Sequence, residues 1–129
     1  MSFKSLGISA ISALALALPV WAHHSHGYYG KEFIDMAGVV TEVHLINPHS
    51  WIYLEVNNDN DPPTIWALEA TNPGGLLRNE IQPDDVRPGD SIKVRCHQLR
   101  DGGNGCLLGF VTPLHGDPER GADVEKEWD

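Results

Sequence analysis

Histidines are the side chains of this sequence best suited to bind a metal ion, and seven occur among 129 residues. His23, His24 and His26 crowd a short stretch near the N-terminus, and His49 follows a proline. Imidazole nitrogens, and the α-amine of a chain that begins with histidine, suit Cu(II) first and Ni(II) or Zn(II) less. A chain that began at His23 would chelate one copper ion through its amine and its own imidazole.

A third nitrogen would complete such a copper site. The sequence offers His24 or His26 nearby, or His49 if the N-terminal arm folds back onto the domain. Two simpler interpretations stay open. The His-rich start can be a polar arm left after cleavage of a leader, and His49 can belong to a turn, because Pro48 fixes its own φ and biases Asn47 toward an extended conformation.

The first 22 residues explain how His23 would become a chain terminus. Lys4 precedes a run of about a dozen apolar residues, which is too short to span a bilayer on its own. Pro19 then breaks the run, and small or compact residues lead up to Ala22. We expect residues 1–22 to be a signal peptide cleaved after Ala22. The mature protein would be periplasmic or secreted, with no membrane insertion after cleavage.

The two cysteines, Cys96 and Cys106, flank the segment 99–105, whose Asp-Gly-Gly-Asn sequence favours a chain reversal. An even number of cysteines in an oxidising compartment favours a disulfide. A thiol metal or redox pair is the alternative, but a separation of ten residues is not a CxxC motif. We therefore predict a disulfide that closes a small hairpin loop.

Apolar and polar residues alternate in short runs downstream of the leader, as in half-buried β-strands. The pattern predicts strands over 38–46, 51–56, 65–70, 91–97 and 107–113, a turn over 57–63, and one or two helical turns within 71–81. This is the element order of an OB-type barrel. We predict an all-β fold, a small five-stranded OB-like barrel with one short helical turn. A small β-sandwich has the same number of strands and stays open.

Composition divides the chain into four segments. We expect a signal peptide over 1–22, a His- and Tyr-rich arm over 23–36, a barrel-like domain over 37–115 and a disordered acidic tail over 116–129. The tail carries six acidic residues against two basic ones and shows no periodicity, which is typical of a solvated chain end.

The net charge and the positions of the aromatic residues indicate which kinds of partner the protein can bind. The formal net charge of -9 argues against nucleic acid and against an anionic membrane surface. Trp51 and Tyr53 alternate on one face of the predicted second strand, and Trp66 lies on the third. Such a face is either a ligand platform or ordinary cross-strand packing.

No Gly-x-Ser-x-Gly, His-Glu-x-x-His or phosphate-binding loop occurs, so we expect a binding module and no enzyme.

Several motifs can be compared with a known family. They are Ala22-His23-His24-Ser25, Gly38-Val-Val-Thr-Glu-Val43, Asn47-Pro48-His49, Trp66-Ala-Leu-Glu69, Arg87-Pro-Gly-Asp90 and Arg100-Asp-Gly102. This set resembles a family of small secreted bacterial proteins known as domain of unknown function 6152. The resemblance implies a signal peptide, one small β domain and no settled activity. The cysteine pair and the acidic tail depart from the family's pattern.

Two functional hypotheses follow. The first is a secreted periplasmic accessory or binding module that holds copper, its only expected cofactor, at His23, His24, His26 and His49. The alternative is a metal-free OB-like module that recruits another periplasmic protein or a small ligand through Trp51, Tyr53 and Trp66.

Overall fold

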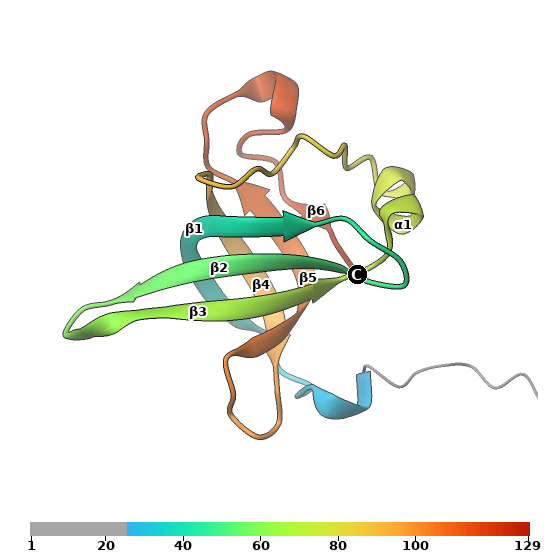
Figure 1. Ribbon diagram of the computed structural model, residues 1–129. Helices are drawn as coiled ribbons and strands as arrows, with labels where there is room; N and C mark the ends of the chain where they lie inside the picture. Colours follow the sequence, from blue (N-terminus) through green and yellow to red (C-terminus); the bar gives the residue numbers. More distant parts are fainter. Residues whose placement is uncertain (1–25) are drawn as a thin grey trace, which may run out of the picture.

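The computed structural model describes residues 26–129 (Figure 1). This part of the chain contains six β-strands and three short helical segments. The strands are β1 Ile34–His44, β2 Ser50–Asn58, β3 Asp61–Ala70, β4 Ser91–Gln98, β5 Gly105–Pro113 and β6 Lys126–Glu127. The helical segments are η1 His26–Tyr28, α1 Pro73–Arg78 and η2 Pro118–Arg120. None of the helices within residues 26–129 is long and apolar enough to cross a bilayer.

The first five strands close into a barrel. Antiparallel pairing gives the order β3-β2-β1-β4-β5, and a parallel pairing between β3 and β5 joins the two ends of the sheet. Leu68 pairs with Cys106 in the middle of this closing contact. The five-stranded barrel predicted from the alternation is therefore confirmed, including the short helix between the third and fourth strands. The sandwich alternative is wrong, because one closed sheet forms the core.

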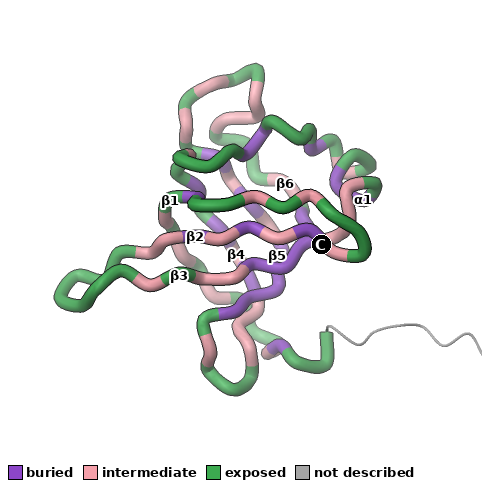
Figure 2. The backbone as a smooth tube through the Cα atoms, in the orientation of Figure 1, coloured by how far each residue is buried: buried purple, intermediate pink, exposed green. Residues whose placement is uncertain are grey.

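The alternation of residue types decides which side chains fill the barrel. Along β2, Ile52 and Leu54 are fully buried, while Trp51 and Tyr53, which alternate with them, are half-buried on the outer face. Figure 2 shows the same pattern at larger scale, with β5 buried along most of its length and the tip of the β2–β3 hairpin exposed. The α1 helix covers one end of the barrel with Leu76.

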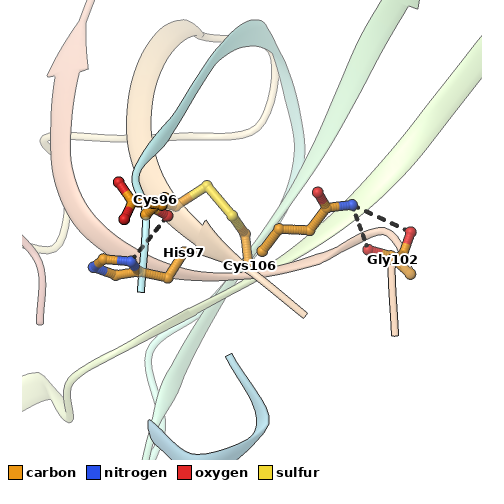
Figure 3. The surroundings of a disulfide bond; sticks show 7 residues. Cys96, His97, Gly102 and Cys106 are labelled. Carbon is orange, nitrogen blue, oxygen red and sulfur yellow. Dashed lines mark hydrogen bonds between the residues drawn. A yellow bond between two sulfur atoms is a disulfide. The ribbon is translucent and has the colours of Figure 1, made fainter. Parts of the chain in front are cut away.

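A disulfide joins Cys96 on β4 to Cys106 on β5, as predicted (Figure 3). The two Cα atoms lie 5.6 Å apart and both side chains are fully buried. The reversal between the strands is held by Gln98, whose side-chain amide donates to the carbonyl oxygens of Gly102 and Gly103 at 3.2 Å each. The disulfide therefore joins the two strands at the base of the β4–β5 hairpin, and the glycines allow the loop between them to reverse.

The expectation of a disordered tail over 116–129 is wrong. The tail forms η2, and its β6 strand pairs with β5 through Lys126 and Glu127. Trp128 is 3% exposed and belongs to the core cluster. The buried tryptophan acts together with backbone hydrogen bonds, such as Asp123 N–H to the Pro113 carbonyl at 2.8 Å, and with the Arg120–Asp90 ion pair, and these contacts order the segment despite its acidic composition.

Candidate functional site

A hydrogen-bonded cluster of three side chains joins the N-terminal arm, the β1–β2 loop and β3. Glu69, on β3, accepts a hydrogen bond from the Tyr29 hydroxyl at 2.5 Å. Its second carboxylate oxygen accepts one from Nδ1 of His49. Glu69 is only 6% exposed, whereas the His49 side chain is 39% exposed. The cluster is therefore closed on the carboxylate side and open to solvent on the imidazole side.

Strand register brings His49 to Glu69. His49 follows a cis Asn47–Pro48 peptide bond and immediately precedes β2. Trp51, two residues further on, pairs with Glu69 in the β2–β3 ladder. His49 is thus close to the end of β3 where Glu69 lies. The chain bends at Asn47 and Pro48, in line with the turn interpretation, and the His49 imidazole hydrogen-bonds the Glu69 carboxylate.

Tyr29 is anchored by its backbone as well as by its hydroxyl. It forms an isolated bridge with Leu99, and its carbonyl oxygen accepts from Nε of Arg100 at 3.0 Å. The next residue, Gly30, donates its N–H to the carbonyl oxygen of Gln98 at 2.8 Å. These bonds hold the arm against the loop between β4 and β5, and Tyr29 itself is 7% exposed.

The protonation of the cluster follows from its burial. Desolvation and the hydrogen bond to Glu69 both raise the pKa of Tyr29 well above its usual range. The phenol therefore keeps its proton and donates a hydrogen bond to the carboxylate. Since a carboxylate only accepts, Nδ1 of His49 is the donor in this hydrogen bond, and in the neutral form of such a ring the lone pair is on Nε2. Among residues 26–129, none hydrogen-bonds this Nε2 atom.

The predicted metal ligands are only partly described. His23 and His24 lie outside the described residues, and His26 begins η1 on the surface. His49 lies in the cluster above. Within residues 26–129, no three or more His, Cys, Asp or Glu side chains are arranged to hold a metal ion. The four-histidine hypothesis therefore stays a prediction that depends on the mature N-terminus.

The predicted aromatic face is wrong in one member. Trp51 and Tyr53 share the outer face of β2, but Trp66 pairs with Leu54 and packs against the core. Directly paired residues lie on the same side of a sheet, so Trp66 faces the barrel interior. The two tryptophans therefore lie on opposite faces of the sheet.

Sequence reasoning missed Glu69. A signal for it was present, because an acidic residue at the end of an otherwise apolar strand is buried only when it is paired. The partner is not visible in the sequence, since His49 and Tyr29 are 20 and 40 residues away.

The model of a family described as "Family of unknown function (DUF6152)" matches residues 11–108. The chain belongs to this family. The matched region contains the whole cluster, and the family expected from the motifs is confirmed. No curated protein matches the chain.

One solved structure supports the barrel assignment. It is the crystal structure of the mitochondrial single-stranded DNA-binding protein Rim1 from S. cerevisiae, with a TM-score of 0.51. The alignment covers 69% of this chain and 98% of that protein at 9% sequence identity. At this identity the likeness is one of fold.

Proposed function

We propose that this DUF6152 protein is an exported binding module that holds one copper ion between its mature N-terminus and His49. The observation that carries the proposal is the Glu69 carboxylate behind Nδ1 of His49. Histidines that bind metals commonly donate their second nitrogen to a carboxylate, which fixes the ring and raises its basicity. Here the arrangement leaves Nε2 as the donor atom for a metal, on a ring that solvent reaches.

The Tyr29 anchor supports the same assignment. Tyr29 binds the same carboxylate as His49, so the arm and the imidazole are fastened at one point. His23 lies six positions before Tyr29, and a chain of that length reaches at most about 20 Å, less where η1 shortens it. A site made of the His23 amine, the His23 imidazole and His49 is thus within reach of the chain. His24 or His26 would supply the third nitrogen in a local variant.

The test compares the processed protein, beginning at His23, with a form that carries one glycine before it. The extra residue turns the α-amine into an amide, which is a poor donor. We expect the processed form to bind one Cu(II) ion, with a nitrogen-rich electron paramagnetic resonance spectrum. Calorimetry should show much weaker binding by the extended form. Equal affinity in the two forms would exclude the N-terminal chelate.

Variants of the cluster separate His49 from the local histidines. His49→Ala should abolish tight binding if the arm folds back, and His24→Ala should do so if the site is local. Glu69→Gln should weaken binding by about 10-fold to 100-fold, the usual cost of losing an outer-shell carboxylate. The matched control is His44→Ala, whose ring is 48% exposed and bonds Glu42. An equal loss in the control would show that copper binds histidines without selection.

A further inference from the structure

The outer face of β1 and β2 carries aromatic and acidic side chains that the copper proposal does not use. Register places Glu42 opposite Tyr53 and His44 opposite Trp51. Glu55 lies two residues beyond Tyr53 on the same side of β2, and Ile65 pairs with it from β3. We call these six residues the acidic aromatic face. Ile65 is 48% exposed, the Glu42 side chain is 61% exposed, and both aromatic rings are half-buried.

Lysine and arginine are absent from the part of the sequence that forms β1, β2 and β3. No lysine or arginine occurs between Lys31 and Arg78, a stretch that contains β1, β2 and β3. The same stretch holds seven acidic residues, of which only Glu69 is buried. The neighbouring strand β4 brings Lys93 and Arg95 beside β1, but among residues 26–129 neither Glu42 nor Glu55 forms an ion pair with a lysine or arginine. Within residues 26–129, the Glu42 carboxylate hydrogen-bonds the His44 ring at 2.8 Å.

This combination selects a cationic ligand. Carboxylates attract lysine and arginine, and the faces of Trp51 and Tyr53 attract the same cations through their π-electrons. Nucleic acid and a second copy of this acidic chain would both be repelled. We propose that the acidic aromatic face binds an extended segment of a partner protein that carries lysine or arginine at alternate positions.

The alternate spacing follows from strand geometry. Glu42 is level with Tyr53, and Glu55 is two residues further along β2. The two carboxylates lie on neighbouring strands about 4.8 Å apart and are offset by about 6.8 Å along them, so their Cα atoms are about 8 Å apart, a distance that long side chains at positions i and i+2 of an extended peptide can span. Docking by strand addition to β3 is disfavoured, because Pro62 and Pro63 lack N–H donors on the part of that strand beyond its pairing with β5. The partner would therefore lie across the face.

Binding can be measured with synthetic probes and the metal-free protein, which makes the result independent of the copper proposal. The probe is a capped peptide of alternating lysine and serine, and the comparison peptide has the same composition with its three lysines adjacent. We expect nuclear magnetic resonance titration to shift amides of β1, β2 and β3 selectively. The alternating peptide should bind about threefold more tightly than the block peptide, since it satisfies one more exposed pair.

Charge variants test the location. Glu42→Gln with Glu55→Gln should weaken binding about fivefold, as expected for two exposed ion pairs. The matched control, Glu119→Gln with Asp123→Asn, removes the same charge from the tail and should change affinity less than twofold. Trp51→Leu should weaken binding about threefold, and Trp51→Phe should restore most of it. Circular dichroism of each variant checks the fold.

Three results would overturn the proposal. Equal weakening by the two charge pairs would indicate attraction to net charge alone. Equal affinity for the alternating and block peptides would exclude an extended partner. Spermidine bound as tightly as the peptide would assign the face to small polyamines.

Discussion

Replacement of Trp128 by alanine is the sharpest test of the folded tail. Trp128 is 3% exposed and lies against Leu76, Ile81 and Val86 around a small apolar cavity of about 40 Å³. Its backbone is also engaged, since its N–H donates to Gly109 at 2.9 Å and its carbonyl accepts from Thr71 at 2.8 Å. The substitution leaves these two bonds in place and removes only the indole.

The expected cost follows from what the indole covers. Removing a buried tryptophan side chain costs about 3 to 5 kcal/mol, because apolar surface returns to water and a cavity remains. The cavity already beside Trp128 would merge with the new space, which favours the upper half of this range. For a domain of this size, the melting temperature should fall by about 15 to 30 °C.

The assay is denaturant unfolding followed by far-ultraviolet circular dichroism, with thermal melts as a second measure. Val124→Ala is the matched control in the same tail, because Val124 is 51% exposed and should change stability by less than about 0.5 kcal/mol. A loss below about 1 kcal/mol for Trp128→Ala would refute the packed tail. The sequence-based expectation of a disordered end would then be restored.

Three further predictions concern the barrel. Replacing Cys96 and Cys106 together by alanine should lower the free energy of unfolding by about 2 to 3 kcal/mol in denaturant titrations, since the loop between them is then unconstrained when unfolded. Burial alone would raise the pKa of Asp90, but a backbone N–H and the Arg120 guanidinium, 2.5 Å away, lower it. Asp90→Asn should therefore destabilise the protein above about pH 4 and lose its effect as the pH falls through the lowered pKa, as measured by unfolding across pH. Gly38→Ala should destabilise β1 strongly in thermal melts, because a Cβ there would lie 2.2 Å from a carbonyl oxygen of β2.

The architecture was predictable because local signals agreed with one another. Alternation gave the five strands, the Pro73-Gly-Gly-Leu-Leu segment gave the helix, and the glycine-rich reversal placed the cysteines on neighbouring strands. In the structure, Asn72 caps that helix by accepting from the N–H of Gly75 at 2.8 Å. The tail was missed because one tryptophan in an acidic segment produces no periodicity, although its burial helps to order the segment.

The candidate site was predictable only in its individual residues. His49 was selected by its residue type and by the proline before it. Its relation to Glu69 and Tyr29 depends on three elements that meet only when the barrel closes, and no local pattern encodes that meeting. The buried carboxylate is the residue on which both others depend. Long-range contacts of this kind set the geometry of the site, while the residue types set its chemistry.

A single β-bulge decides which aromatic residues face outward. At the tip of the β2–β3 hairpin, Asn58 pairs with Asp61. If that register continued unbroken, Trp66 would lie opposite Tyr53, and the three aromatic residues would share one face. The register shifts by one residue between Val56 and Asn58, so that Trp66 pairs with Leu54 and turns into the barrel. Because a one-residue shift reverses the facing of every later side chain, the bulge separates a core tryptophan from an outer aromatic pair. The outer face is left with Trp51, Tyr53 and the carboxylates beside them, and this composition favours a cationic partner over a broad aromatic platform.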